Sequence, residues 1–362
     1  AVGARTEPNA RATQVELHDG LAVATQNRWP SLRFDVGAMT NLLSPLFPSG
    51  FYYKTFMWPS APKWWLKYEH VIRNIAGMGV AAAEPDPDHY EHQFGHCDVL
   101  VIGGGPAGLA AARAAAHSGA RVILCEETPV LGGSLLGEET TIDGAPAAAW
   151  LAGVRRELAA NPDVTVLTRA SAFGHYDGNL VGVIERVTNH LAALPAHVPR
   201  ERLWKIRAKA VVLAAGAIER SIAYANNDLP GTLLAGAART YVRRYGVRPG
   251  SRAVVFTNND SAYASALALH EAGVAIAAIV DARPDTGPDG ALATQARAAG
   301  LAIIAGSAII DAHGGLHVTA VDVAPLGAAG GASRRFECDL VCVSGGWNPV
   351  VHLFSQARGK LR

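Results

Sequence analysis

The sequence predicts an α/β protein in which one strand–turn–helix–strand unit occurs twice, behind a segment rich in aromatic residues. Three observations support this fold class. The unit first runs through residues 98–127, and the same order of elements returns in residues 251–283. The continuous apolar run AVVLAAG at 210–216 is typical of a buried parallel strand. Eleven of the 25 aromatic residues lie between Trp29 and Tyr68, which sets that segment apart from both units.

Composition narrows the class of protein. The 362 residues are 49% hydrophobic and 17% charged, as expected of a folded globular chain rather than a disordered one. A net charge of +1 gives no reason to expect nucleic acid or a membrane surface as a partner. We find no membrane-spanning run and no signal peptide, and the four scattered cysteines suit a cytoplasmic protein. The chain starts at Ala1 without a methionine, so we expect a piece of something longer.

The first unit carries a G-x-G-x-x-G turn formed by Gly103, Gly105 and Gly108. Gly103 allows a tight turn, Gly105 lets backbone approach a pyrophosphate, and Gly108 lets helix and strand pack closely. Pro106 suits the first helical position because it has no N–H to leave unpaired. The positive end of the helix dipole would then face the phosphates, which predicts a Rossmann-like dinucleotide-binding domain. The alternative is a glycine turn that binds nothing.

Acidic and small residues extend this predicted site. Glu126 ends the second strand, where a carboxylate accepts hydrogen bonds from an adenosine ribose and repels a 2′-phosphate, so NAD or FAD is favoured over NADP. Gly132, Gly133 and Ser134 follow and are expected to return to the pyrophosphate. A helix is predicted at 145–160, a strand at 164–169 and an antiparallel pair of strands at 180–187 and 203–207. Ala172 would lie against the adenine edge, and the small residues that end the 210–216 strand, including Gly216, would let the cofactor come close.

The second unit has lost the glycines. Thr257, Asn259 and Ala262 stand where the first unit has Gly103, Gly105 and Gly108. A side chain at Asn259 would obstruct the backbone approach to a phosphate, and Asp260 adds negative charge there. We therefore expect a nested structural copy without a ligand. The alternative of an intact second site depends on Asp281 alone as a ribose acid.

Other residues invite functional interpretations that we weigh against simpler ones. The aromatic segment either packs on the dinucleotide domain or forms a surface for another subunit. His89, His92, His96 and Cys97 could suggest a metal, but a polar linker without a second ligand cluster is favoured, and no metal site is predicted.

The last two cysteines, Cys338 and Cys342, would share a face of a strand in the segment 337–349. They do not form a C-x-x-C or C-x₄-C redox pair on a helix, so we expect a buried structural pair. The same segment is expected to deliver Gly345 and Gly346 toward the first domain.

These motifs together resemble known families. The two units resemble the nested domains of the pyridine nucleotide–disulfide oxidoreductase superfamily. The stretches NRWPSL, FDVGA, SPLFPSGFYYKTFMWP, GGGPAG and SGGWNP are similar to the large α subunit of heterotetrameric sarcosine oxidase along essentially the whole chain. The resemblance implies that a ferredoxin-like domain before residue 1 and a folate-binding, aminomethyltransferase-like region after the last residue belong to the longer subunit.

The resemblance also implies a division of labour. In the family, sarcosine is oxidised at an FAD in the β subunit, electrons pass to a covalent FMN at the α/β interface, and oxygen becomes hydrogen peroxide. The one-carbon unit passes to tetrahydrofolate, and γ and δ subunits complete the assembly. The α subunit holds NAD without a redox part. Carried over residue by residue, the pyrophosphate contacts are Gly103, Gly105, Ala107 and Gly108, and the ribose contacts are Glu126, Glu127 and Thr128. No catalytic residue is assigned.

The predicted organisation has three parts. Residues 1–95 are an extension or interface segment, residues 96–230 with 335–362 the dinucleotide-binding domain, and residues 231–334 the nested, degenerate second domain. Two alternatives remain open for the function: an FAD-binding subunit of a related amine dehydrogenase, and an assembly module whose nucleotide site is vestigial.

Overall fold

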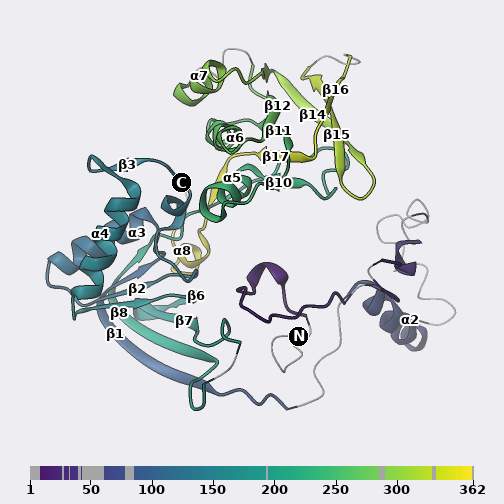
Figure 1. Ribbon diagram of the computed structural model, residues 1–362. Coiled ribbons are helices and arrows are strands. Elements are labelled where there is room, and N and C mark those ends of the chain that lie inside the picture. The colour runs from purple at the N-terminus through teal and green to yellow at the C-terminus, as the bar shows by residue number, and fades with distance from the viewer. Residues whose placement is uncertain are drawn as a thin grey trace. The chain divides into compact units, whose positions relative to one another are not determined.

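The computed structural model shows two compact units, shown as ribbons in Figure 1. The first unit is formed by Ala1–Gln93 with Ile184–Leu203, and the second by Phe94–Val183 with Trp204–Arg362. The structure describes the residues 9–26, 28–31, 33–39, 42, 61–77, 85–192, 195–284, 290–327 and 332–360. Much of the aromatic segment, residues 43–60, therefore lies outside the described residues.

The first unit contains the 3₁₀ turn η1 (Ala12–Gln14) and the helix α2 (Ala61–Ile75). Ion pairs join its strand ends: Arg202 contacts Glu91 at 3.0 Å and Glu185 at 3.1 Å. Of the described aromatic side chains of this segment, Trp29, Phe34 and Trp64 are exposed, whereas Trp65 and Tyr68 are half-buried. The centroids of the Trp64 and Tyr68 rings lie 6.2 Å apart. The choice between packing on the dinucleotide domain and a surface for another subunit stays a prediction.

Six strands form the first sheet, in the order β5-β2-β1-β8-β7-β6. Their bounds are β1 (Tyr90–Ile102), β2 (Val122–Cys125), β5 (Val164–Leu167), β6 (Ala170–Tyr176), β7 (Leu180–Arg186) and β8 (Glu201–Leu213). The strands β1, β2 and β5 are parallel, with Ile102 opposite Cys125 and Cys125 opposite Leu167. The chain leaves β1 toward β2 and later returns on its other side as β8. This reversal at β1 is the place where open α/β sheets bind ligands.

Helices cover one face of this sheet. The helices α3 (Pro106–His117) and α4 (Ala147–Ala160) bury Leu109, Leu151 and Leu158 against Val101 and Leu124. The strands β6 and β7 and the short helix α8 (His352–Gln356) contribute to the core on the opposite face, where Leu100 and Ile206 are fully buried. Side chains alternate between the two faces along each strand, so each face of the sheet packs against its own apolar core.

Two strands differ from their predicted extents. β1 begins at Tyr90 rather than at Asp98, so His92, His96 and Cys97 lie on a strand and not in a polar linker. Alternation along β1 exposes His92 and His96 and buries Cys97, a pattern that the polar composition hid. β8 joins the two separately predicted strands at 203–207 and 210–216 into one. Its last residues are half-buried rather than buried. Val211 and Leu213 pack against the core on one face of the sheet, and Val212 packs against the core on the other.

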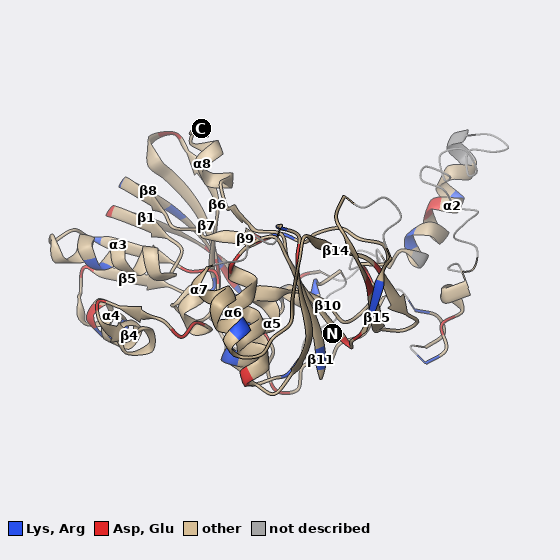
Figure 2. Cartoon of the chain, turned by 90° about the horizontal axis from the view of Figure 1, so that it is seen from above, with Lys and Arg blue, Asp and Glu red and all other residues tan. Residues whose placement is uncertain are grey.

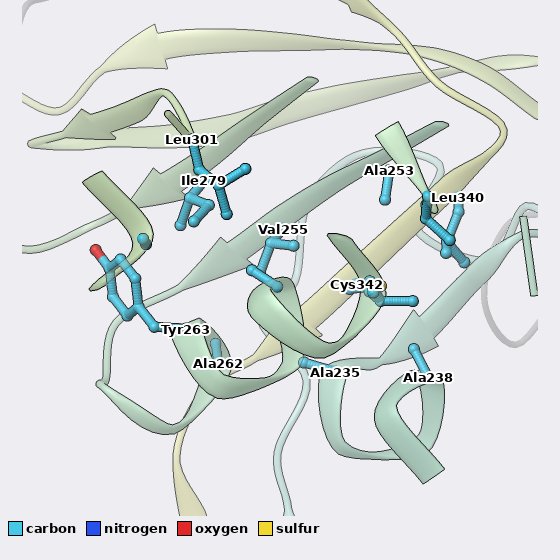
Figure 3. Packing of buried hydrophobic residues seen from close by; sticks show 14 of the residues in the cluster. Ala235, Ala238, Ala253, Val255, Ala262, Tyr263, Ile279, Leu301, Leu340 and Cys342 are labelled. Carbon is cyan, nitrogen blue, oxygen red and sulfur yellow. The ribbon is translucent and has the colours of Figure 1, made fainter. Parts of the chain in front are cut away.

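A second sheet of five parallel strands has the order β10-β17-β11-β12-β13. Their bounds are β10 (Thr232–Leu234), β11 (Arg252–Thr257), β12 (Ala275–Asp281), β13 (Ile303–Ala305) and β17 (Leu340–Ser344). The helices α5 (Ala235–Tyr245), α6 (Ser261–Glu271) and α7 (Ala291–Ala298) pack on one face. Figure 3 shows this core, in which Tyr263 and Ala262 of α6 lie near Val255 and Ile279.

The other face of the second sheet is covered by β14 (Ser307–Gly314), β15 (Val318–Pro325) and β16 (Arg334–Glu337), which form an antiparallel sheet. The two cysteines expected to share a strand face are separated by this arrangement. Cys338 precedes β17 and packs in the core under β14–β16, whereas Cys342 on β17 packs in the core under the helices. Both remain buried free thiols.

The chain returns to the first sheet after β17 through a two-stranded ribbon of β9 (Ala217–Glu219) and β18 (Trp347–Pro349). The N–H of Gly345 donates to the Arg220 carbonyl at 2.7 Å, and that of Val350 to Gly216 at 3.0 Å. Gly345 and Gly346 are thus delivered to the end of β8, as predicted. β17 itself pairs in the second sheet, whereas the predicted boundary at residue 335 placed it with the first domain. The domain division remains a prediction.

The remaining elements are short: η3 (Gly133–Leu136), β3 (Thr141–Ile142), β4 (Ala145–Pro146) and η4 (Asp177–Asn179). Figure 2 shows Lys, Arg, Asp and Glu scattered along the chain, with most of the ribbon formed by other residues. Within the described part of the chain, no helix combines the length and apolar character needed to cross a lipid bilayer.

Candidate functional site

The first glycine turn is built so that two of its glycines are required by the chain itself. Gly103 has a φ of +108°, and a Cβ there would lie 2.2 Å from the carbonyl oxygen of Ala214. A Cβ on Gly108 would lie 1.8 Å from the Gly103 carbonyl oxygen. Both distances are far shorter than van der Waals contact, so any larger residue would force helix α3 away from β1 and β8.

Gly105 differs from its neighbours because no packing within the chain requires it. Its φ is −75° and its ψ −174°, an extended conformation that any residue adopts. The nearest atom to a Cβ built on Gly105 is the Cα of Gly133, at 4.0 Å. The space next to this glycine is therefore open on the protein side. A side chain would fill the space through which a ligand's phosphates reach the backbone.

Helix α3 presents its N-terminus to this space. Pro106 occupies its first turn, and no side chain caps the N-terminal N–H groups. Three turns of aligned peptides give this end a partial positive charge, and the N–H groups there point out of the helix. The combination of an uncapped N-terminus and an unfilled glycine position is the arrangement that binds phosphate in dinucleotide-binding folds.

Glu126 lies beside the turn and is 8% exposed. Its Oε2 accepts the N–H of Gly104 at 2.6 Å, and its Oε1 accepts the N–H and the hydroxyl of Thr128 at 2.8 and 2.7 Å. A carboxylate offers about four acceptor positions, so three donors leave it short of saturation. The Thr128 hydroxyl also lies 3.0 Å from the Val130 carbonyl. It can turn its single proton there and free Oε1 for a hydroxyl of a ligand.

Backbone hydrogen bonds bring the other predicted residues around the same strand ends. Gly132 donates to Gly104 at 2.8 Å, Ala170 donates to Glu126 at 2.8 Å, and Ala214 donates to Ile102 at 2.8 Å. Ala172 follows two residues into β6 and is half-buried, while Gly216 follows β8. The predicted residues that remain exposed at these ends are Ala107, Glu127, Thr128, Gly133, Ser134 and Gly216.

The structure adds residues that the sequence pattern did not single out. Gly104 would place a Cβ 2.6 Å from Leu131 and 2.9 Å from Glu126, so it must be small for the acid to reach the turn. Ala214 supplies the carbonyl that Gly103 approaches. The run of three glycines at 103–105 was a signal for Gly104, but nothing in the sequence marked Ala214, because its role depends on β8 lying next to β1.

The cysteines and histidines do not build a reactive centre among the described residues. Burial raises the pKa of the Cys97 thiol and of the Cys338 thiol to about 11 each, so both stay protonated near neutral pH. No group of three or more His, Cys, Asp or Glu side chains in the described part of the chain could hold a metal ion.

The second turn is filled by its own side chains. Asn259 donates from Nδ2 to the Ser344 carbonyl at 3.0 Å, and its Oδ1 accepts the N–H and the hydroxyl of Ser261 at 3.1 and 2.6 Å. Asn259 therefore occupies the start of helix α6, whereas the corresponding space at Gly105 in the first glycine turn is open. The hydroxyl of Thr257 also accepts the N–H of Asn259 at 3.0 Å.

The acid of the second strand–turn–helix–strand repeat, Asp281, has all its hydrogen-bond acceptor positions occupied. Asp281 is fully buried, and its carboxylate accepts hydrogen bonds from four donors. Its Oδ1 accepts the backbone N–H and the Nε of Arg283 at 2.9 and 3.1 Å, and its Oδ2 accepts the Tyr263 hydroxyl and the Nη2 of Arg283 at 2.7 Å each. Arg283 also pairs with Asp260 at 2.8 Å, across the start of α6. Asp281 has no position left for a ribose, and Arg283 lies where a second dinucleotide would enter. This geometry argues against the alternative of an intact second site.

Solved structures share this fold. The chain matches L-proline dehydrogenase from P. horikoshii with a TM-score of 0.55 at 23% identity, over 77% of this chain and 48% of that one. It matches T. acidophilum thioredoxin reductase with a TM-score of 0.55 at 16% identity, over 71% of this chain and 79% of that one. The predicted α/β class with dinucleotide-binding domains is thereby confirmed. These identities are too low to carry more than the fold.

Sequence comparisons are more specific. The family model described as FAD dependent oxidoreductase matches residues 98–184, which include the first glycine turn and Glu126. The alpha subunit of sarcosine oxidase from Rhizobium meliloti (strain 1021) is 48% identical over 358 residues, covering 99% of this chain. This chain is a homologue of the sarcosine oxidase α subunits. The resemblance predicted from the sequence is confirmed, and the homologues place the chain in an oxidoreductase family.

The match extends to other α subunits, but the chain covers only about a third of the length of these relatives. The alpha subunit of sarcosine oxidase from Corynebacterium sp. (strain P-1) is 48% identical over 79% of this chain. The chain spans 35% of the length of the R. meliloti protein and 30% of the Corynebacterium one. The family supports a flavin or other dinucleotide as cofactor, and the naming of these relatives as alpha subunits indicates that they work in multi-subunit complexes.

Proposed function

We propose that this chain is the dinucleotide-binding part of an α subunit in a multi-subunit oxidoreductase that oxidises sarcosine. The observation that carries the proposal is the first turn, where the space at Gly105, the uncapped helix α3 and the carboxylate of Glu126 occur together. They do so in a chain 48% identical, over 99% of its length, to a sarcosine oxidase α subunit. The second turn, filled by Asn259 and Arg283, would serve the fold only.

Each predicted residue has a role in this proposal. The pyrophosphate would lie on the turn and the start of α3, and Gly133 and Ser134 would close the site from the opposite side. The Glu126 carboxylate would accept from the adenosine ribose once Thr128 turns its hydroxyl to Val130. The residues proposed to contact the cofactor are Gly103, Gly105, Pro106, Ala107, Gly108, Glu126, Glu127, Thr128, Gly133, Ser134, Ala172 and Gly216.

The nucleotide carries no 2′-phosphate in this proposal, because Glu126 would repel it. NAD and FAD share the adenosine half that these residues address. The resemblance to sarcosine oxidase α subunits favours NAD held without a redox role. The family model described as FAD dependent oxidoreductase favours FAD, whose flavin would accept and pass on electrons. NAD remains our proposal and FAD is its alternative.

The oxidation itself would take place outside this chain. We assign no catalytic residue to it, and its raised thiol pKa values argue against cysteine chemistry. The β subunit would carry FAD for the amine and share an FMN with α, and γ and δ subunits would complete the complex. The exposed aromatic side chains Trp29, Phe34 and Trp64 favour a surface that another chain or segment covers.

The first test identifies the nucleotide. The protein is purified, denatured, and the released small molecules are analysed by mass spectrometry and visible absorption. NAD without flavin absorption is the expected result. Release of FAD would replace NAD by the alternative, a flavin-carrying subunit. An empty site that also takes up neither nucleotide in isothermal titration would overturn the cofactor proposal.

The second test addresses the reaction. The chain is isolated with its native partners, and oxygen uptake with sarcosine is compared with uptake on other N-methyl amino acids and on opines. Opines are included because an opine oxidase subunit from Agrobacterium tumefaciens (strain Ach5) is 30% identical over 51% of this chain and 36% of its own length. We expect peroxide formation from sarcosine by the complex and none by this chain alone. Faster turnover of another amine would favour the related-dehydrogenase alternative.

The third possibility, an assembly module with a vestigial site, is separated by Gly105→Asp. The substitution places a side chain and a negative charge in the phosphate space. Under our proposal the variant loses the nucleotide. The assembly module would be favoured if neither the wild-type chain nor the variant held nucleotide and both formed a complex that assembles and turns over normally.

A further inference from the structure

We propose that helix α5 of the second domain acts as a buttress for residues 131–139, the loop that closes the first nucleotide site. Arg239 and Arg243 are then positioning residues for nucleotide binding. The inference rests on the site proposed above, and it assigns a task to a domain whose own site is filled. All the contacts involved lie within the second unit, Phe94–Val183 with Trp204–Arg362.

One end of this loop forms a wall of the open space at Gly105. The N–H of Gly132 donates to the Gly104 carbonyl at 2.8 Å. A Cβ on Gly133 would lie 2.8 Å from the Gly105 Cα, so the two backbones are as close as glycine permits. Any movement of residues 131–134 therefore changes the width of the space that the phosphates would enter.

The other end of the loop is attached to α5. Glu138 pairs with Arg239 at 3.0 Å, and Glu139 pairs with Arg243. Between them and the site lies Gly137, where a Cβ would be 4.0 Å from both the Thr240 Cα and the Arg243 Cβ. The loop thus lies directly on the helix and is joined to it by two ion pairs.

Helix α5 is itself firmly held. Ala235 and Ala238 are fully buried in the core of the second sheet. The buried carboxylate of Glu219 accepts the N–H of Gly236 at 2.7 Å, at the positive end of the helix dipole. The helix ends at Tyr245 and is followed by Gly246, which caps it in the left-handed conformation with a φ of +64°. The surface that the loop contacts therefore cannot shift without disturbing that core.

The loop has a physical need for such support. It contains Gly132, Gly133 and Gly137, and the first two have φ values of +135° and +52°. Glycine-rich segments lose much conformational entropy when they are ordered, and a ligand that must order them binds more weakly. Arg155 of α4 contacts the Leu131 carbonyl and holds the near end. The far end depends on α5.

The two ion pairs should contribute unequally. The side chains of Arg239 and Glu138 are 19% and 32% exposed, whereas Glu139 is 75% exposed. Solvent and salt weaken the exposed pair more than the half-buried one. Arg239 is therefore the principal positioning residue, and Arg243 adds to it.

The test compares Arg239→Gln with two matched controls. Glu271→Gln removes a different partner of Arg243, on α6, without touching the loop, and Arg335→Gln removes a distant ion pair with Asp322. Nucleotide affinity is measured by titration, and hydrogen exchange of the Gly132 amide reports loop opening. We expect Arg239→Gln to bind about three- to ten-fold more weakly, because the ligand must now order the loop. The Gly132 amide should exchange faster, with both controls unchanged.

A charge swap keeps the test decisive if Arg239→Gln also lowers thermal stability. Arg239→Glu combined with Glu138→Arg should restore slow exchange and affinity, which a general loss of stability would not do. Unchanged Gly132 exchange in Arg239→Gln overturns the buttress. Exchange is measured without ligand, so it decides the inference even if the protein binds no nucleotide, an outcome that would overturn the proposed function instead.

Discussion

The two glycine-turn positions of this molecule have the same backbone plan and opposite local chemistry. In the first, the chain leaves open space at Gly105 and the acid Glu126 keeps an acceptor that one hydroxyl rotation frees. In the second, Asn259 fills the turn and Asp281 is saturated by Tyr263 and Arg283. The comparison teaches that a strand–turn–helix–strand–acid pattern identifies the fold. Whether the acid can accept a hydrogen bond from a ligand depends on how many of its acceptor positions the chain's own donors occupy.

The filled turn is stabilised by the groups that close it. Asp281 is a buried carboxylate, which would be unfavourable without the guanidinium of Arg283 and the hydroxyl of Tyr263. Hydrogen bonding to Asp281 and ion pairing with Asp260 hold the pKa of Arg283 far above its usual range, so it stays charged. Asp260, Arg283 and Asp281 thus form an internal chain of ion pairs at the second turn, and the predictions below test its contribution.

The largest effect is expected from Gly108→Ala in the first turn. The added methyl would lie 1.8 Å from the Gly103 carbonyl oxygen, and helix α3 would have to move. We expect the free energy of unfolding to fall by about 3 kcal/mol. At the matching position of the second turn, Ala262→Gly should cost only about 1 kcal/mol. Denaturant titration of both variants checks this, and equal losses would contradict the comparison.

Removing Arg283 should come next. Arg283→Met leaves the carboxylate of Asp281 buried with fewer donors, at a cost of about 2–3 kcal/mol in the free energy of unfolding. Asp281→Asn combined with Arg283→Met removes the charge as well and should lose less than Arg283→Met alone. Neither variant should gain nucleotide binding at the second turn, because Asn259 still fills it. A second equivalent of bound nucleotide would show that Arg283 alone closes the site.

A smaller effect separates ligand space from packing. Gly105→Ala should leave the free energy of unfolding within about 0.5 kcal/mol, since no atom of the chain lies nearer than 4.0 Å to the new methyl. Nucleotide affinity should fall by about 10- to 100-fold through overpacking against the phosphates. Titration and thermal unfolding measure the two quantities. A stable variant with unchanged nucleotide affinity would mean that the phosphates do not enter the open space at Gly105.

The smallest effect concerns the thiols of the two sheets. Burial raises the pKa of Cys97 in the first sheet to about 11 and the pKa of Cys342 in the second sheet well above its ordinary value. A raised pKa keeps the thiol protonated, so at pH 8 alkylation should require local opening. Nucleotide should slow modification of Cys97 and Cys125 and leave Cys338 and Cys342 unchanged. Mass-spectrometric rates test this, and slowing at all four would indicate one cooperative unit.

Local signals in the sequence were sufficient for much of the fold. The helix at Pro106, the strand ending next to Glu126 and the repeat beginning at Ser251 all follow from glycine, proline and apolar spacing. The sequence also predicted that Gly345 reaches the first domain. It missed the length of β1, because polar side chains on one exposed face hid the alternation. It also divided β8 into two strands.

By itself, the sequence determined the fold class, the family and the loss of glycines in the second turn, because these depend on residue types at short spacings. Only the tertiary structure decided how the two acids are paired, that Cys338 and Cys342 lie in different cores, and that α5 lies on the loop before Glu139. The two ion pairs between α5 and the loop, for example, join residues 101 and 104 positions apart. Their partners are chosen by the packing of whole elements, which no local pattern of residues records.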